Sequence, residues 1–272
     1  MKRIFNIITL VTVFLAISCV KNDYIKQADY DLKTNYEVFW KLVDENYCFL
    51  GNNYGYTKNV DWKKVYNDMM PRVEIATTEE ELLDIMGESI DFLKDGHVWI
   101  DTKFKHRGCY TFYYDENGVR YPDNFISGLI PEKYLDYTYK TRNGHRYGVI
   151  TRGGKKFFYL HHAEFIKELN NEDIEMMLPH IAEADCFIYD IRTNPGGNAQ
   201  LAHTVAGRFV KEKTLVGYDV VKTGKGYDEL TEPSPVYVVP NRKGPNWAHI
   251  KSTVLTNRDV YSTANMFAAF MK

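Results

Sequence analysis

Apolar side chains recur at three- and four-residue steps through the first third of the chain, which is the spacing of amphipathic helices. The pattern holds from about residue 30 to residue 93. Its first apolar face comprises Tyr36, Phe39, Trp40, Val43 and Tyr47. These positions predict a small helical bundle, which we place in an N-terminal helical domain of residues 19–96.

Two later helix starts in this region carry signals of their own. Asp61 is a suitable N-cap for a helix that begins at Trp62, and Pro71 is expected to end that helix. Thr78 is followed three residues later by Glu81, so the pair resembles a capping box that opens a third helix.

The pattern changes between residues 97 and 145. Tyrosine, phenylalanine and glycine are mixed there with charged residues, and turn signals occur at 116–118 and 142–144. We therefore predict a small β-rich insert of short strands and loops.

From residue 146 to residue 272 strand signals alternate with helix signals. Two apolar stretches flank Gly153-Gly154 and predict a hairpin, and a helix is expected over 164–184. Two strand-turn-helix units follow, with strands at 186–191 and 252–255 and helices around Val205 and over 262–271. The predicted fold class is α/β, with the core in this last part.

The first 18 residues have the pattern of a secretory signal: Lys2 and Arg3 precede an apolar run that ends at Ser18-Cys19. Small residues before a cysteine resemble a bacterial lipoprotein signal, so we expect Cys19 to be lipidated and to anchor the chain to the cell envelope, as an outer-membrane lipoprotein facing the periplasm or the surface. The alternatives are an ordinary signal peptide or an uncleaved anchor. The segment 21–23 resembles the charged export tag of Bacteroidetes surface lipoproteins.

The charge balance and the cysteine spacing argue against several classes of partner and of structural site. The chain has 34 basic and 36 acidic residues and a formal net charge of −2, which disfavours nucleic acid and anionic membrane surfaces as partners. Beyond Cys19 the cysteines are Cys48, Cys109 and Cys186, without a CxxC pair, so neither a disulfide framework nor a cysteine zinc site is indicated. A single disulfide bond between two of these three cysteines stays an alternative.

The turn after the first core strand carries candidate chemistry. It contains Pro195-Gly196-Gly197 just before a helix, where glycine lets peptide N–H groups approach a ligand and the helix N-terminus favours negative charge. The second turn places Ser262 at the start of the final helix. Ser262 alone would be interpreted as an N-cap. If the two strands are neighbours, however, Ser262 faces the glycine amides, which is the geometry of a nucleophile beside an oxyanion hole.

A serine nucleophile needs a base, and His97 in Asp95-Gly96-His97 is the best placed of the eight histidines. His161 and His162 could suggest a metal pair with Glu164, but neighbouring residues of a strand point to opposite faces. We expect no metal and no cofactor. His203, in the helix after the glycines, is expected to be a packed or surface residue.

Together these residues resemble the S41 family of C-terminal processing peptidases and tricorn-like proteases. The resemblance rests on three motifs in order: Asp95-Gly96-His97, the strand turn from Asp190 to Gly197, and the segment 254–267 around Ser262. It implies a crotonase-like or ClpP-like core and hydrolysis of a peptide or protein substrate through an acyl-enzyme. Ser262 would be the nucleophile, His97 the general base, and the amides of Gly196 or Gly197 and of Thr263 the oxyanion donors.

The chain departs from this family in several ways. Asn265 stands where the family usually has an acidic residue, and Lys272, ten residues after the serine, is too far along the same helix to act as base. The carboxylate that follows the serine in tricorn-like members is absent, and the insert is too short for a regular PDZ domain. We therefore expect a serine endopeptidase represented by a truncated chain. The alternative is a non-catalytic peptide- or ligand-binding lipoprotein on the same fold.

Overall fold

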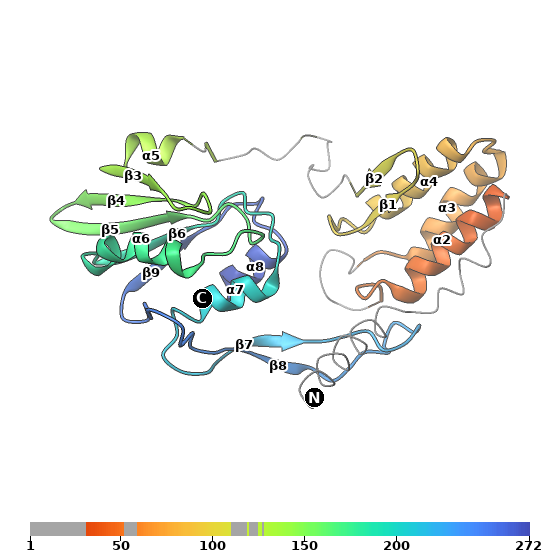
Figure 1. Ribbon diagram of the computed structural model, residues 1–272. Helices are drawn as coiled ribbons and strands as arrows, with labels where there is room; N and C mark the ends of the chain where they lie inside the picture. The colour runs from red at the N-terminus through yellow and green to blue at the C-terminus, as the bar shows by residue number, and fades with distance from the viewer. Residues whose placement is uncertain (1–30, 52–58, 110–118, 120–124, 127) are drawn as a thin grey trace, which may run out of the picture. The chain divides into compact units, whose positions relative to one another are not determined.

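The computed structural model describes residues 31–51, 59–109, 119, 125–126 and 128–272 (Figure 1). The predicted signal sequence and Cys19 lie outside these ranges, as does most of the segment around the turn signal at 116–118. Contacts divide the chain into two compact units, one of residues 1–121 and 220–232 and the other of residues 122–219 and 233–272. The residues predicted as one insert, 97–145, are thus shared between the two units.

The first unit is built on the three predicted helices, α2 (Leu32–Asn46), α3 (Trp62–Ile75) and α4 (Glu79–Asp91). Their start signals act as expected: Asp61 accepts a hydrogen bond from the Lys64 amide, and Thr78 and Glu81 form a complete capping box. The helices bury a shared core that includes Tyr36, Trp62, Val65, Leu82 and Ile90.

The prediction that Pro71 ends the second helix is wrong, because Pro71 lies inside α3. A proline in a helix interior costs about 3 kcal/mol through a lost hydrogen bond and a steric clash. Here the buried face of α3 continues past it, from Met69 to Val73, so packing of the last turn overrides the local preference.

A short hairpin and a distant segment complete the first unit. Strands β1 (Trp99–Asp101) and β2 (His106–Gly108) pair antiparallel, and Arg107 joins the hairpin to α4 through an ion pair with Asp91 of 2.6 Å. The segment 220–232 contributes Tyr227, whose hydroxyl donates to Asp44 on α2.

The second unit contains a five-stranded mixed sheet in the order β3-β4-β5-β6-β9. The strands are β3 (Tyr137–Lys140), β4 (Arg146–Arg152), β5 (Lys155–His161), β6 (Cys186–Asp190) and β9 (Lys251–Leu255). The pairs β3–β4 and β4–β5 are antiparallel, whereas β5, β6 and β9 run parallel. The hairpin and both core strands predicted from the sequence are confirmed.

Three helices pack against this sheet: α6 (Asn171–Ala182), α7 (Ala199–Ala206) and α8 (Thr263–Phe270). Their apolar faces meet the sheet in a core that includes Phe158, Phe187, Tyr189, Ala202 and Phe267. The α/β fold class and the N-terminal helices are as predicted. Helix α6 begins at residue 171 instead of 164, because Asn170 caps it by accepting from the Asp173 amide.

One hairpin and one short helix were not predicted. Strands β7 (Thr214–Asp219) and β8 (Ser234–Val238) form a separate antiparallel hairpin, and α5 (Leu129–Lys133) is a short helix where short strands and loops were expected. The three cysteines beyond Cys19 are free thiols. Across the described part of the chain, no helix is long and apolar enough to cross a membrane.

Candidate active site

The two turns singled out in the sequence lie beside each other at one edge of the second unit's sheet. Strands β6 and β9 are neighbours in parallel register, with Asp190 opposite Leu255, so the turns that follow them leave the same edge (Figure 1). The condition set by the sequence, that the strands be neighbours, is therefore met.

Ser262 has an unusual backbone conformation. Its φ of 53° and ψ of −127° lie outside the ordinary regions for a residue with a side chain, at a cost of about 1–3 kcal/mol. Although Ser262 occupies the N-cap position of α8, its hydroxyl makes no capping hydrogen bond. The interpretation of this serine as a simple N-cap is therefore not supported. A strained serine on a sharp turn between strand and helix is the arrangement of a nucleophile elbow.

Backbone strain marks each of the three motifs. Among the described residues, the non-glycine residues with positive φ are Lys94, Thr193 and Ser262. Lys94 directly precedes Asp95-Gly96-His97, and Thr193 lies in the turn after β6. Such conformations persist only where the surrounding structure holds them, and they cluster at functional sites.

The glycine turn touches the Ser262 turn directly. A Cβ atom on Gly196 would lie 2.8 Å from the Ser262 Cβ and 2.9 Å from the Thr263 nitrogen, so only glycine fits. Two hydrogen bonds fasten the turns together, one on each side of the serine. The Tyr261 amide donates to the Asn194 carbonyl at 3.1 Å, and the Thr263 hydroxyl donates to the Gly197 carbonyl at 2.7 Å.

The backbone donors of these turns differ in their availability. The Gly196 N–H donates to the Asn194 side chain at 2.8 Å and is therefore engaged. The N–H groups of Gly197 and Thr263 have no acceptor among the described residues of this unit, and Gly197 is exposed. Thr263 opens α8, where the helix dipole adds to the attraction for negative charge.

Asn194 is the residue that organises the glycine turn, and sequence reasoning did not single it out. It is fully buried, and its side chain accepts from the Gly196 amide while donating to the His162 carbonyl at 2.8 Å. The signal available in the sequence was an asparagine two residues before paired glycines, a position from which its oxygen can reach a nearby backbone N–H.

The end of β6 is fixed by a buried ion pair. The Asp190 carboxylate accepts from the Arg192 guanidinium at 2.9 Å and 2.6 Å and from the Tyr159 hydroxyl at 2.7 Å. The hydrogen bonds that Arg192 donates to Asp190 raise the pKa of Arg192, and burial raises the pKa of Tyr159. Because Asp190 neutralises it, Arg192 supports the turn and is not a spare positive charge for a ligand.

The first unit presents His97 with an orienting carboxylate. The Asp95 Oδ1 lies 3.2 Å from the His97 Nδ1 and accepts from the His97 amide at 2.9 Å, while Oδ2 accepts from the Tyr47 hydroxyl at 2.8 Å. The imidazole is half exposed, with 52% of its side-chain surface accessible, and Asp95 is mostly buried. In the tautomer that carries its proton on Nδ1, facing Asp95, the other ring nitrogen, Nε2, is the acceptor that a general base needs.

The sequence analysis did not predict Asp95 and Tyr47 as site residues, although Asp95 belongs to the motif Asp95-Gly96-His97. The signal for Asp95 was its position two residues before the histidine, from which a carboxylate can reach the imidazole. His97 and Ser262 belong to different units, so their pairing stays a prediction. Lys272 lies beyond the far end of α8, about 13 Å along the helix axis from its start, in agreement with the expectation that it is too distant.

Three histidines of the second unit, His161, His162 and His203, have packing roles. His162 is fully buried with Nδ1 2.6 Å from the Tyr189 hydroxyl, and burial lowers its pKa to about 3. His161 instead stacks on Phe125, and His203 packs against Phe270 as expected. Within the described ranges, no group of three histidine, cysteine or acidic residues is arranged to hold a metal ion.

Comparisons with known proteins support the family resemblance. Residues 156–272 match the sequence profile of Peptidase family S41, and residues 29–91 match that of the Tricorn protease C1 domain. No curated protein matches the chain.

Among solved structures, a protein of Parabacteroides merdae ATCC 43184 that is named a candidate peptidase is 30% identical. The match has a TM-score of 0.76 and covers 89% of this chain and 72% of that one. Mature CPAF complexed with lactacystin is 9% identical at a TM-score of 0.59, over 87% of this chain and 81% of that one. Mature CPAF alone is 10% identical at a TM-score of 0.58, and the match covers 88% of this chain and 80% of that one.

The CPAF structures show a shared fold, while the Parabacteroides protein is similar in both sequence and structure over most of its length. The resemblance inferred from Asp95-Gly96-His97, the glycine turn and the Ser262 segment is thereby confirmed. The chain belongs to peptidase family S41.

Proposed function

We propose that the protein is a serine endopeptidase that cleaves peptide bonds through an acyl-enzyme, with Ser262 as nucleophile and His97 as general base. The observation that carries the proposal is the conformation of Ser262, which is strained, uncapped and in contact with the Gly196 turn. A serine that only capped a helix would need neither the strain nor the glycine contact.

In this mechanism His97 Nε2 removes the proton from the Ser262 hydroxyl as the oxygen attacks the scissile carbonyl, and later delivers it to the leaving amine. The tetrahedral oxyanion lies between the N–H groups of Gly197 and Thr263, neither of which has an acceptor among the described residues of its unit. One such donor is worth about 3–4 kcal/mol in enzymes where it has been removed.

Asp95 takes the orienting role in this proposal. Its carboxylate holds the tautomer of His97 and stabilises the imidazolium that forms during acylation. Tyr47 fixes the other carboxylate oxygen, so Asp95 is held from both sides.

The test is labelling with a fluorophosphonate probe, which reacts with an activated serine. We expect the full-length protein to be labelled and both Ser262→Ala and His97→Ala to lose labelling. His106→Ala is the matched control, because His106 is also exposed and also lies against a carboxylate, that of Asp101, at 2.6 Å. Folded wild-type protein that resists labelling would favour the non-catalytic binding protein instead.

We further propose an envelope location, with Cys19 lipidated after signal cleavage. The support is the sequence pattern that ends at Ser18-Cys19. Metabolic labelling with a palmitate analogue should mark the wild type and the Cys48→Ala control but not Cys19→Ala. Equal labelling of all three would refute the anchor.

A further inference from the structure

A groove opens beside His97 on the first unit and has a volume of about 560 Å³. One wall comes from α2, with Phe39 and Leu42, and the other from the chain that follows His97, with Trp99 in β1. Leu42 is 40% exposed and Trp99 is 53% exposed. Two large apolar side chains therefore face the groove from opposite walls instead of entering the core.

The charge of this groove is already compensated. Its acidic residue, Asp101, accepts from the Trp99 indole at 2.9 Å and lies against His106, and the hydrogen bond from His106 lowers the pKa of the Asp101 carboxyl. Among the described residues that line the groove there is no lysine or arginine. A charged side chain would lose hydration there without gaining a new partner, whereas an apolar one would gain contact.

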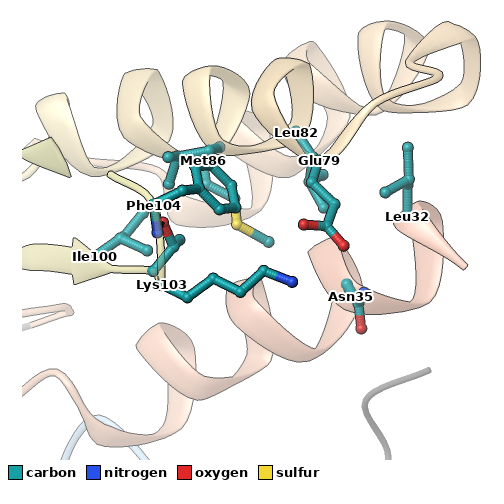
Figure 2. Close-up of a pocket in the computed structure, with 10 residues that line it drawn as sticks. Leu32, Asn35, Glu79, Leu82, Met86, Ile100, Lys103 and Phe104 are labelled. Atoms are coloured by element: carbon teal, nitrogen blue, oxygen red, sulfur yellow. Dashed lines mark hydrogen bonds between the residues drawn. The ribbon is translucent and has the colours of Figure 1, made fainter. Parts of the chain in front are cut away.

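A second groove on the same unit provides the contrast. It lies between the start of α2, α4 and the hairpin after β1, with a volume of about 600 Å³. Figure 2 shows that Lys103 extends across it in the direction of Glu79, so charged groups line its apolar floor. None of the predicted site residues lines this second groove.

We infer that the groove beside His97 binds a large apolar side chain of the substrate peptide, that of the residue directly after the scissile bond. This inference rests on the proposed function. The base must lie within about 3 Å of the leaving nitrogen to protonate it, and successive residues of an extended peptide are about 3.3–3.6 Å apart. A groove lined by the imidazole itself is therefore adjacent to the first residue of the leaving segment.

The preference should be measurable. Burial of a leucine or phenylalanine side chain in place of serine corresponds to about a 10- to 100-fold gain in kcat/KM. We propose to compare internally quenched peptides that differ only after the scissile bond, carrying leucine, phenylalanine, serine, aspartate or lysine. The wild type should prefer leucine and phenylalanine by that factor over serine and reject both charged residues.

Two variants and one control assign the preference to the groove. Trp99→Ala should reduce the ratio of kcat/KM for the leucine peptide to kcat/KM for the serine peptide at least 5-fold. A general loss of activity would lower both values and leave this ratio unchanged. Leu42→Asp should shift the preference from leucine to lysine, because it adds a carboxylate to the wall. Phe104→Ala is matched to Trp99→Ala, since Phe104 is 50% exposed and lines the second groove but not the groove beside His97, and it should keep the wild-type ratio.

Binding to the Ser262→Ala protein separates this inference from the proposed function. Product peptides that begin with leucine should bind it more tightly than those that begin with serine, with the difference lost in Ser262→Ala/Trp99→Ala. An apolar preference in binding without probe labelling of the wild type would overturn the peptidase proposal and keep a peptide groove. Labelling with no preference in cleavage or binding would overturn the groove alone.

Discussion

The two halves of the proposed machinery are held in place by different means. The Ser262 turn is fixed by backbone: two parallel strands, a glycine that nothing else can replace, and hydrogen bonds on both sides of the serine. The His97 turn depends mainly on one side chain, because the Asp95 carboxylate both contacts the exposed imidazole and accepts from the His97 amide. The nucleophile half is therefore rigid and intolerant of change, while the base half can adjust and depends on single side-chain contacts.

The largest effect is expected from Gly196→Ala, which tests the rigidity of the nucleophile half. The new Cβ would lie 2.8 Å from the Ser262 Cβ, at a φ of +103° that alanine avoids. We expect more than a 100-fold loss of probe labelling and a decrease of about 2–3 kcal/mol in the free energy of unfolding. Gly153→Ala is the control, since Gly153 also has positive φ but no atom within 4 Å, and it should be labelled normally. Normal labelling of Gly196→Ala would show that the turn is not rigid.

Asp95→Asn probes the base half. The amide can no longer favour the Nδ1–H tautomer of His97, so we expect a loss of about 100-fold or more in the rate of labelling with little change in thermal stability. Asp95→Glu should retain more activity than Asp95→Asn. Asp84→Asn alters an exposed carboxylate on the same unit that pairs with Lys105, and it should react like the wild type. If Asp95→Asn did the same, His97 would not depend on this contact.

A smaller effect is expected from Thr263→Val, which keeps the side-chain shape and the backbone N–H. It removes the 2.7 Å hydrogen bond to the Gly197 carbonyl and so loosens one side of the oxyanion site. We expect about a 10-fold decrease in kcat/KM with an unchanged KM, because the site acts on the transition state. Thr263→Ser restores the hydroxyl and should recover most of the loss. An increase in KM alone would instead indicate a role in substrate binding.

The smallest expected effect is a difference between the two units in how much stability each loses in acid. His162 in the second unit has a pKa lowered to about 3 by burial, so only the unfolded state takes up its proton as the pH falls below 6.5. Stability present above pH 6.5 is therefore lost on acidification, by about 1 kcal/mol between pH 6.5 and 5.5 for this one group. Hydrogen exchange measured at both pH values and corrected for the slower intrinsic exchange in acid should show lower protection of β5 and β6 at pH 5.5, with the protection of α3 and α4 nearly unchanged. An equal loss of protection in both units would contradict the assignment to His162.

The parts of the fold set by local signals could be predicted from the sequence. The Asp61 cap, the Thr78 capping box and the strands that lead to Asp190 and Leu255 depend on neighbours within a few residues. Pro71 was mispredicted because the burial of Val73 depends on packing between helices, which a local rule does not include. The β7–β8 hairpin was missed because most of its residues are exposed and give no clear alternation.

The sequence predicted the residue types of the candidate site but not its hydrogen bonds. The motifs pointed to Ser262, His97 and the glycine pair as candidates, yet the sequence left Gly196 and Gly197 equivalent. They differ because the buried Asn194 side chain engages the Gly196 amide alone. Such a choice depends on the orientation of one side chain, and the spacing of residues along the chain does not specify that orientation.

The positive φ of Ser262 also bears on how the protein tolerates mutation. Glycine adopts this conformation without the strain that serine carries, so Ser262→Gly should raise the melting temperature while it abolishes the proposed chemistry. Selection for stability alone would favour glycine at this position. A serine there persists only while its hydroxyl is useful to the cell, and the ratio of serine to glycine at position 262 among natural variants measures how strongly that use is maintained.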